Sequence, residues 1–239
     1  MSQDPAVEER TKRLATVGLL EPLAAEEIAR LAQRIPESSF ESGELIYLPR
    51  DSSNVVFLLL TGRVRLYGAL GEQEFTFEVV QSGTMFGEAS LMERPHDEYA
   101  QALEPSRVAL LDSNTFWHLA RQNREVNAKA LWLVGERLRL NKSRLLTIAL
   151  KEVPNRLASL ILELLEGEGL VTSEGHYKIR NHYTHEQLAT MIGAKRVSTT
   201  NALGYLQDIG CVQLRRRQIY VTDLAALQRV AAGDYRMPS

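Results

Sequence analysis

The chain has little cysteine, no long apolar run and no excess of positive charge. Cys211 is the only cysteine among 239 residues, so the chain can form no intramolecular disulfide and cannot supply the several thiolates of an iron–sulfur cluster. The longest apolar runs, such as residues 55–60, are far shorter than a membrane span, and the polar residues 1–13 do not resemble a secretion signal. We therefore expect a cytoplasmic protein with no membrane contact.

The sequence also lacks any recognisable catalytic, metal or haem site. It contains no P-loop and no arrangement of Ser, His and Asp that is typical of a nucleophilic enzyme. His96 and His118 are isolated, and the other histidines, His176, His182 and His185, lie in the carboxy-terminal part. A haem iron needs axial ligands that this pattern does not provide. We predict that the protein is not an enzyme and binds neither a metal nor haem.

Composition indicates a soluble globular protein of one or two domains. Hydrophobic residues make up 44% and charged residues 24% of the chain, which excludes disordered, collagen-like and purely coiled-coil proteins. The 28 Lys and Arg residues against 30 Asp and Glu residues give a net charge of −2. A nucleic-acid site, if there is one, must therefore arise from local charge.

The amino-terminal part, residues 1–113, has the pattern of a β-rich domain with a helical flank. Residues 23–31 carry apolar side chains at helical spacing, and Pro36 with its neighbours ends that pattern. Short apolar or alternating runs then follow at residues 45–48, 55–60, 64–67, 75–80 and 108–111. Glycine-containing turn signals separate these runs, which is typical of a compact antiparallel sandwich or roll.

Residues 114–151 return to helical periodicity after the capping residues Ser113 and Asn114. Within them a seam follows the heptad spacing 3, 4, 3, 4, 3, formed by Leu131, Val134, Leu138, Asn141, Leu145 and Ile148. Such a helix packs either on its own β domain or on the same helix of a second chain. Asn141 favours a homodimer, because a polar seam residue costs stability in a core but fixes the register of paired helices.

Residues 152–239 have the pattern of a helix-turn-helix followed by a β-hairpin. A helix is predicted from Val153-Pro154, and a polar, hairpin-like connection at residues 173–181 leads to residues 184–206. There Thr184 and Gln187 form a capping box and Gly193 permits a tight turn. The buried faces of the two helices are predicted from five apolar residues: Leu188, Ile192, Val197, Leu203 and Leu206.

Positive charge gathers in this segment, although the whole chain is slightly acidic. Between Gly193 and Arg217 there are five basic residues and one acidic residue, Asp208. Polar side chains at the start of the second helix and the arginines between the last two strands predict an interface with the major groove and the phosphates of double-stranded DNA. The predicted DNA-binding residues are Thr184, Lys195, Arg196, Val197, Ser198, Thr199, Asn201, Arg215, Arg216 and Arg217.

A β-rich domain, a long helix and a winged helix-turn-helix, in this order, resemble the family of the cyclic-AMP receptor protein and the fumarate and nitrate reduction regulator (CRP/FNR). Residues 82–92, Ser-Gly-Thr-Met-Phe-Gly-Glu-Ala-Ser-Leu-Met, are similar to the family's Gly-Glu phosphate-binding cassette. The resemblance implies an α+β chain with a cyclic-nucleotide-binding-like β-roll, a dimerisation helix and a DNA-binding domain. It also implies a bacterial transcription regulator that meets RNA polymerase.

The resemblance implies an effector site formed by Gly87, Glu88, Ala89, Tyr99, Asn141 and Lys142. In family members that bind cyclic nucleotides, the cassette glutamate holds the ribose, and an arginine about ten residues later pairs with the phosphate. Residues 97–99, Asp-Glu-Tyr, occupy that second position, which disfavours ordinary cyclic-AMP binding because the acids would repel the phosphate. Glu88 then either contacts a ligand or caps backbone amides, and the chain acts either without an effector or with a different small molecule.

The recognition helix keeps only part of the family pattern of arginine, glutamate and a second arginine. Arg196 occupies the first position, and Val197 and Asn201 stand at the other two, so the operator should differ from that of the classical receptor. The alternative function is a sensing module that acts through protein contacts, like the cyclic-nucleotide-binding subunits of kinases or channels. The basic hairpin and the polar array of residues 195–201 favour a DNA-binding regulator instead.

Overall fold

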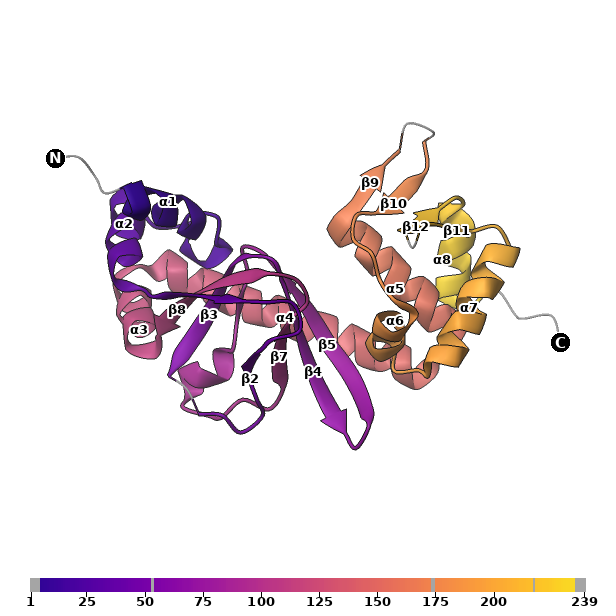
Figure 1. Ribbon diagram of the computed structural model, residues 1–239, viewed down its shortest axis with the longest axis horizontal. Helices are drawn as coiled ribbons and strands as arrows, with labels where there is room; N and C mark the ends of the chain where they lie inside the picture. The colour runs from indigo at the N-terminus through magenta and orange to yellow at the C-terminus, as the bar shows by residue number, and fades with distance from the viewer. Residues whose placement is uncertain (1–4, 53, 173–174, 217, 235–239) are drawn as a thin grey trace. The chain divides into compact units, whose positions relative to one another are not determined.

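The computed structural model describes residues 5–234 apart from residues 53, 173–174 and 217 (Figure 1). The chain forms two compact units. The first contains the described residues up to Leu70 together with Phe77–Arg139, and the second contains Gly71–Thr76 together with the described residues from Leu140 onward. The division therefore falls inside the long helix α4 (Arg124–Leu150), whereas the sequence analysis places domain boundaries at the ends of the helical segment.

Two four-stranded sheets form the β-roll of the first unit. One sheet has the strand order β1-β8-β3-β6 and the other has the order β2-β7-β4-β5. The strands are β1 (Glu37–Phe40), β2 (Leu45–Tyr47), β3 (Val55–Thr61), β4 (Arg63–Leu70), β5 (Gln73–Gln81), β6 (Met85–Phe86), β7 (Tyr99–Ala102) and β8 (Ser106–Asp112). Neighbours far apart in sequence pair in antiparallel register, as Leu58 does with Ala109.

Strand β3 is buried on both faces, which explains its unbroken apolar sequence. Phe57 and Leu59 point into the core between the two sheets, where they join Val64, Phe86 and Val108. The alternate side chains, Val56, Leu58 and Leu60, belong to a second core under the helices. Successive side chains of a strand point to opposite faces, so one strand can supply both cores.

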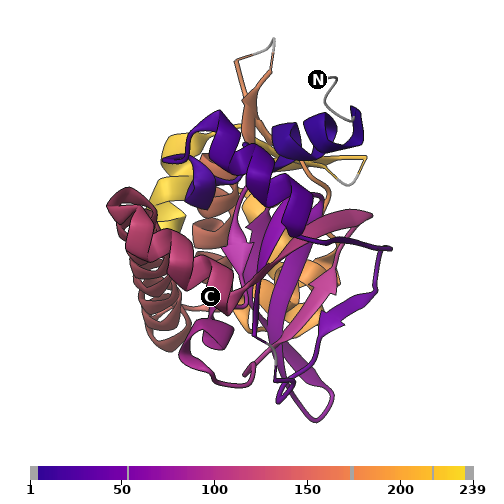
Figure 2. The same cartoon turned by 90° about the vertical axis from the view of Figure 1, so that its left-hand side faces the viewer.

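Helices cover the second face of this sheet. They are α1 (Pro5–Leu14), η1 (Gly18–Leu20), α2 (Ala25–Arg34), η2 (Glu88–Met92), α3 (Ser113–Gln122) and the first part of α4. Leu14, Ile28, Phe116 and Val126 bring α1, α2, α3 and α4 into one core with β3 and β8. Figure 2 shows α1 and α2 lying together on this unit.

The helical segment that the sequence predicts after residue 113 is two helices. Asp112, not Ser113 or Asn114, caps α3, because its carboxylate accepts a hydrogen bond from the Thr115 backbone N–H at 3.0 Å. Asn123 separates α3 from α4, and its side-chain oxygen accepts a hydrogen bond from the Glu125 backbone N–H at 3.0 Å. A capping side chain therefore starts each helix.

Besides Gly71–Thr76 and the last part of α4, the described residues of the second unit form four helices and a four-stranded sheet of order β11-β12-β10-β9. Its elements are α5 (Val153–Glu168), β9 (Gly169–Val171), β10 (Tyr177–Ile179), α6 (His185–Ile192), α7 (Arg196–Asp208), β11 (Val212–Arg215), β12 (Gln218–Val221) and α8 (Leu224–Ala232). The predicted α+β class, with a β-roll, a long helix and a winged helix-turn-helix, is confirmed. Helix α8 is an element that the sequence analysis did not predict.

The described residues contain neither a membrane-spanning helix nor a cluster of metal-binding side chains. Within residues 5–234, apart from residues 53, 173–174 and 217, no helix is long and apolar enough to cross a lipid bilayer. In the same residues no three His, Cys, Asp or Glu side chains are grouped so that they could hold a metal ion.

Gly87, the residue before η2, provides a test of the β-roll. Its φ is +74°, and a Cβ atom added there would lie 2.6 Å from Cδ2 of the buried Phe57 ring. Gly87→Ala should therefore lower the free energy of unfolding both through the left-handed backbone, which costs about 1–2 kcal/mol, and through overpacking, which costs about 1–3 kcal/mol.

Gly71→Ala is the matched control for that variant. Gly71 also has a positive φ, +61°, but an added Cβ would meet no atom within 4 Å. Urea denaturation of both variants should show the larger loss for Gly87→Ala, by about 2 kcal/mol. Equal losses would mean that Phe57 does not restrict the turn.

Candidate nucleic-acid interface and effector site

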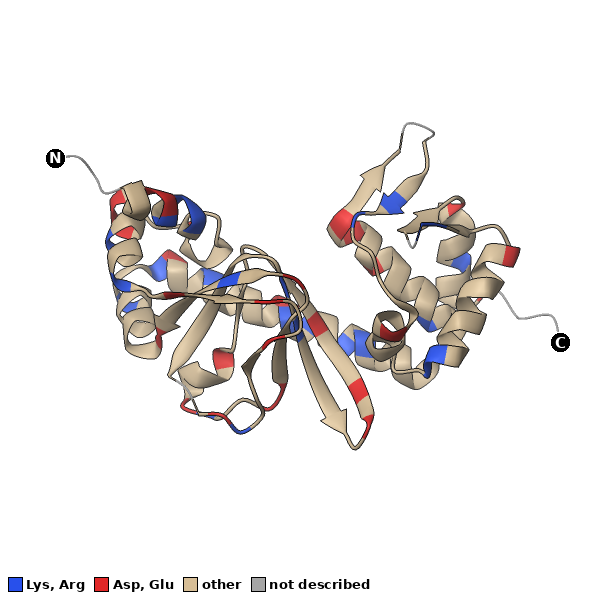
Figure 3. Ribbon diagram, viewed as in Figure 1, with Lys and Arg blue, Asp and Glu red and all other residues tan. Residues whose placement is uncertain are grey.

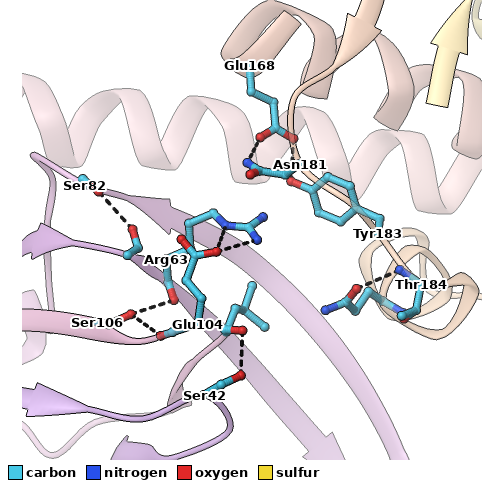
Figure 4. Close-up of polar contacts among 12 residues, drawn as sticks. Ser42, Arg63, Ser82, Glu104, Ser106, Glu168, Asn181, Tyr183 and Thr184 are labelled. Atoms are coloured by element: carbon cyan, nitrogen blue, oxygen red, sulfur yellow. Dashed lines mark hydrogen bonds and ion pairs between the residues drawn. The ribbon is translucent and has the colours of Figure 1, made fainter. Parts of the chain in front are cut away.

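Thr184 starts the first helix of the helix-turn-helix with the predicted capping box. Its hydroxyl accepts a hydrogen bond from the Gln187 backbone N–H at 3.1 Å, and the Gln187 side-chain oxygen accepts one from the Thr184 backbone N–H at 2.8 Å (Figure 4). Two backbone donors of the first turn are satisfied in this way. The start of α6 is thereby fixed in place.

A buried carboxylate holds the segment that leads into α6. Glu168, at the end of α5, accepts a hydrogen bond from the Tyr183 hydroxyl at 2.6 Å and a second from the Asn181 side-chain amide (Figure 4). Glu168 and Tyr183 are both buried. A charge-assisted hydrogen bond in a buried site stabilises one geometry, so the chain reaches Thr184 from a defined direction.

The turn between α6 and α7 depends on Gly193. This residue has a φ of +62°, and the next residue, Ala194, donates its backbone N–H to the Ala189 carbonyl at 3.0 Å. Arg156 on α5 donates to the Ile192 and Gly193 carbonyls at 3.4 Å. Glycine adopts this left-handed conformation without the strain that a Cβ atom would cause.

Four of the five predicted apolar residues form the buried face of the two helices. Leu188, Ile192, Leu203 and Leu206 are almost fully buried. The prediction for Val197 is wrong, because its side chain is 71% exposed. Val197 lies in the first turn of α7, where a helix that packs by its other face leaves this position open to solvent.

The exposed face of α7 carries most of the predicted polar array. Arg196, Val197 and Asn201 are exposed, Lys195 is the exposed residue that precedes the helix, and Ser198 is half-buried. The prediction that Thr199 binds DNA is wrong, because its side chain is fully buried. The Thr199 hydroxyl donates to the Lys195 carbonyl at 3.1 Å. Its side chain stabilises the first turn of α7 and cannot reach a base.

The basic hairpin follows directly after α7. Strands β11 and β12 pair from Val212 with Val221 to Arg215 with Gln218. Arg215 and Arg216 are exposed, and Arg216 has a φ of +51°, a conformation that is costly for a residue with a Cβ atom. Arg217 lies outside the described residues. Strain of this kind is common at binding sites, which is consistent with the predicted phosphate contact.

The Arg215 side chain is held in place although it is exposed. Its guanidinium carbon lies 5.1 Å from the centre of the Tyr220 ring, and its Nε donates to the Gln213 side-chain oxygen at 2.8 Å. Figure 3 shows Lys and Arg colouring at the start of α7, Asp and Glu colouring at its end, and a mixture of both charge signs over the rest of the chain. The positive charge at the start of α7 and on the hairpin is therefore local, as the predicted phosphate contacts require in a chain of nearly neutral composition.

The predicted effector residue Glu88 forms an ion pair with an arginine of the same unit. Arg137 of α4 donates to Glu88 at 2.6 Å, to Glu78 at 2.6 Å and to the Met85 carbonyl at 2.8 Å. Burial by itself lowers the pKa of Arg137, but the two carboxylates more than offset this effect, so the pKa is raised. Glu88 thus forms an ion pair with Arg137, and the hydrogen bonds of the described residues include none from a backbone amide to its carboxylate. Its contact with a ligand stays a prediction.

Arg137 is a residue that the sequence analysis missed. Val126, Ala130 and Leu133 are the buried or half-buried positions of α4 that pack on the core of the first unit. Arg137 continues this stripe at helical spacing, four residues after Leu133. An arginine on an otherwise apolar helix face is the signal that could have identified it.

The position of the family's phosphate-binding arginine is acidic in the structure as well. Asp97 is exposed, whereas Glu98 is half-buried and accepts a hydrogen bond from the Tyr47 hydroxyl at 2.9 Å. Burial raises the pKa of Glu98, and the nearby charge of Glu88 raises it further. Residues 97–99 thus place two carboxylates where the family supplies a guanidinium, and the expectation that ordinary cyclic AMP is disfavoured stays a prediction.

Tyr47 also packs against a buried histidine. The rings of Tyr47 and His96 stack with centres 3.8 Å apart, and His96 is 1% exposed. Burial lowers the pKa of His96 and raises the pKa of Tyr47. His96 is therefore an uncharged core residue and does not replace the absent arginine as a phosphate-binding cation.

The remaining predicted effector residues are spread over both units. Gly87 and Ala89 flank Glu88, and Tyr99 on β7 stacks on the Tyr67 ring at 4.9 Å between centres. Asn141 and Lys142 are exposed residues of α4 that belong to the second unit. The structure brings Gly87, Glu88 and Ala89 together, and their relation to the other three remains a prediction.

The predicted dimerisation seam is an open apolar face. Leu131 is 74% exposed, Leu138 54% and Leu145 67%. Val134 and Asn141 are also exposed, and Ile148 is half-buried. A single chain therefore leaves most of the seam uncovered.

Cys211 is buried at the start of the hairpin, and its thiol donates to the Leu206 carbonyl at 3.3 Å. Burial raises the pKa of this thiol to about 11. The thiolate is the reactive form of cysteine, so Cys211 is a packing residue.

Comparisons with known proteins agree with both halves of this architecture. Residues 37–123 match the cyclic nucleotide-binding domain family, and residues 155–230 match the Crp-like helix-turn-helix domain family. The chain is 29% identical over 218 residues, covering 90% of it and 97% of its relative, to the cyclic AMP receptor protein of Thermus thermophilus. It is 23% identical, over 91% and 98%, to the CRP-like cAMP-activated global transcriptional regulator of Mycobacterium tuberculosis.

A solved structure shows the same fold. A CooA mutant from Carboxydothermus hydrogenoformans superposes with a TM-score of 0.79 at 24% identity, over 90% of this chain and 96% of that one. The β-roll, the long helix and the exposed recognition helix with its adjoining hairpin define a DNA-binding transcription regulator. Since both domain families match this chain and the relatives align with it over nearly their whole length, the chain belongs to the CRP/FNR family.

The carboxylate of Glu98 provides a pH test of the acidic site. Its raised pKa means that the folded protein keeps this proton to a higher pH than the unfolded chain does. Stability therefore falls as pH rises from about 4.3, the ordinary value for glutamate, through the raised value. Glu98→Gln removes this cost and still accepts the Tyr47 hydroxyl, so the variant should be more stable than the wild type at pH 7.5.

The stability difference should shrink as the pH falls toward 4.5, which urea denaturation at several pH values would measure. Glu72→Gln, at an exposed residue of the β4–β5 turn, is the control and should show no comparable gain. If Glu98→Gln destabilises the protein at pH 7.5, the carboxylate is favourable in the fold and the account of this site is wrong.

Proposed function

We propose that this regulator binds a pseudo-palindromic operator as a homodimer and activates at least some promoters by meeting RNA polymerase. The observation that carries the DNA-binding part is the exposed polar face of α7 beside an arginine-rich hairpin. A helix of this kind enters the major groove, and the hairpin reaches the flanking phosphates. The contact with polymerase and the activating role rest on the resemblance to the family alone.

Each exposed side chain of the interface has a chemistry that suits one part of DNA. Arg196 presents a guanidinium that can bind guanine O6 and N7 with two hydrogen bonds. Val197 offers a methyl contact to thymine, and Asn201 reads adenine or holds a phosphate. Phosphate contacts are expected at the start of α6, at the start of α7 and at the hairpin. The residues there are Thr184, Lys195, Ser198, Arg215 and Arg216.

The open seam on α4 supports a homodimer. Leucines that are more than half exposed on one face of a long helix keep their apolar surface in contact with water unless a second helix covers them, and this contact is unfavourable. A two-fold dimer would place two α7 helices in successive major grooves about 34–36 Å apart, which is why the operator should be a pseudo-palindrome.

The effector remains a separate question from DNA binding. Glu88 is paired with Arg137, and Glu98 stands at the place of the phosphate-binding arginine, which together disfavour ordinary cyclic AMP. The names of two relatives mention cyclic AMP, but the domain family alone does not decide which effector this chain binds. The protein acts either without an effector or with a ligand other than cyclic AMP, and calorimetry with cyclic AMP would measure no binding heat.

The division of roles between α7 and the hairpin predicts different effects of two arginine variants. Arg196→Ala should cost about 1–3 kcal/mol on a selected site and should relax the preference for guanine. Arg216→Ala should weaken binding to every sequence and reduce the slope of affinity against salt by about one unit. Fluorescence anisotropy over a salt series, on selected and on random duplexes, would measure both effects.

An unchanged sequence preference in Arg196→Ala would show that the assigned orientation of α7 is wrong. A wild-type protein without salt-dependent affinity even for random duplex DNA would instead favour the alternative function, a sensing module that acts through protein contacts.

The dimer prediction is tested on the seam. Leu138→Glu places a charge at the centre of the open face and should convert a micromolar dimer into a monomer. Val171→Glu is the matched control, because Val171 is 71% exposed on β9 and lies outside the seam. Light scattering would measure the mass of each, and a monomeric wild type at micromolar concentration would refute the dimer.

A further inference from the structure

His185, the first residue of α6, was not among the predicted DNA-binding residues, yet it contacts the exposed face of α7. Its Nδ1 lies 2.8 Å from the hydroxyl oxygen of Thr200. Thr200 is exposed and lies on the same side of α7 as Arg196 and Val197, one turn further along the helix. The hydrogen bond therefore joins the start of α6 to the middle of the face that we assign to base recognition.

The direction of this hydrogen bond follows from the other partner of Thr200. The Thr200 hydroxyl also lies 3.0 Å from the Arg196 carbonyl, to which it donates. A hydroxyl has one proton, so while that proton is donated to the Arg196 carbonyl the oxygen accepts from His185, and Nδ1 carries the ring proton. In the neutral ring the proton is then absent from Nε2, which is a hydrogen-bond acceptor.

Nothing in the described part of the chain uses this acceptor. The only hydrogen bond that His185 makes there, through its side chain, is the one from Nδ1 to Thr200. Because Nδ1 and Nε2 lie on different sides of the ring, fixing Nδ1 on Thr200 turns Nε2 away from α7. The bond thus fixes both the orientation of the ring and the chemical character of its outer atom.

We propose that His185, positioned by Thr200, is a further specificity-determining residue that accepts a hydrogen bond from an exocyclic amino group in the major groove. Adenine N6 and cytosine N4 are the donors of that kind, whereas guanine and thymine present acceptors at the corresponding edge. The inference rests on the proposed function, because it needs α7 to lie in the major groove. It extends the reading surface from α7 to the first residue of α6.

The alternative partner for His185 is a backbone phosphate. A phosphate offers only acceptors, so it would require a protonated Nε2 and would be bound equally in every sequence. The tautomer that Thr200 imposes on the neutral ring favours the base donor. The two contacts differ in what they change: one alters sequence preference and the other alters overall affinity.

Three substitutions distinguish the role of Nδ1, which contacts Thr200, from the role of Nε2, which is proposed to contact a base. Thr200→Val keeps the shape of the side chain but removes the hydroxyl that orients the ring. His185→Asn can still donate to Thr200 from a position close to Nδ1, but it has no group at the place of Nε2. His185→Gln can reach the place of Nε2 with an amide oxygen and is the conservative variant. Gln207→Ala, at an exposed residue near the end of α7, is the control.

The test selects duplexes from a randomised pool with each variant and then measures competition on the selected site with one base pair changed at a time. The wild type should prefer an adenine or cytosine amino group at one position of each half-site by about tenfold. Thr200→Val and His185→Asn should both reduce that preference to less than about twofold at this same position, while the guanine preference from Arg196 persists. His185→Gln should retain part of it, and Gln207→Ala all of it.

The inference is overturned if Thr200→Val and His185→Asn leave the selection profile unchanged, or if they weaken all sequences by one common factor. Thermal unfolding followed by circular dichroism shows whether each variant is folded, and an unfolded variant would lose the Arg196 preference as well. If the wild type itself selects no sequence, the proposed function fails, and this inference fails with it. The inference is supported if Thr200→Val and His185→Asn lose the preference for adenine or cytosine at that one base position and keep the guanine preference from Arg196.

Discussion

The function of this protein depends on a single packing constraint, the burial of one face of α7. Leu203 and Leu206 on α7, with Leu188 and Ile192 on α6, are removed from water. Each buried leucine or isoleucine side chain contributes about 1.5–3 kcal/mol, so the helix cannot rotate about its axis without losing several such contributions. The opposite face, which includes Arg196 and the other exposed residues, is consequently held outward. The left-handed turn at Gly193 and the Glu168 carboxylate fix where the helix-turn-helix begins and bends.

In the first unit the same kind of scaffold holds a site of different chemistry. Arg137 forms ion pairs with both Glu78 and Glu88, and Glu98 is paired only with the neutral hydroxyl of Tyr47 among the hydrogen bonds described. In this domain, which matches the cyclic nucleotide-binding family, the cassette glutamate Glu88 accepts a hydrogen bond from Arg137 of the same chain. The family fold is therefore retained while the cassette glutamate is paired with an arginine of this chain, and function has to be argued from such a site and not from the fold.

Much of this architecture could be predicted from the sequence because its signals are local. The apolar run of β3, the capping box at Thr184 and the glycine turn before α7 each depend on neighbouring residues, and each is present in the structure. Contacts across long sequence separations could not be predicted in the same way. The pairing of Arg137 with Glu88 spans 49 residues, and the bond between His185 and Thr200 joins two helices. The errors have a similar cause: Val197 and Thr199 exchange their expected environments because a small shift in the helix phase decides which side chain faces the core.

The most direct test of the account is a selection from randomised duplex DNA with the purified wild-type protein at moderate ionic strength, with and without cyclic AMP. The account predicts enrichment of an inverted repeat whose half-sites are one helical turn apart, about 10–10.5 base pairs from centre to centre, with guanine at one position of each half-site. It also predicts the same enriched sequence without the nucleotide. A pool that stays random under both conditions would contradict the assignment of α7 as the recognition helix.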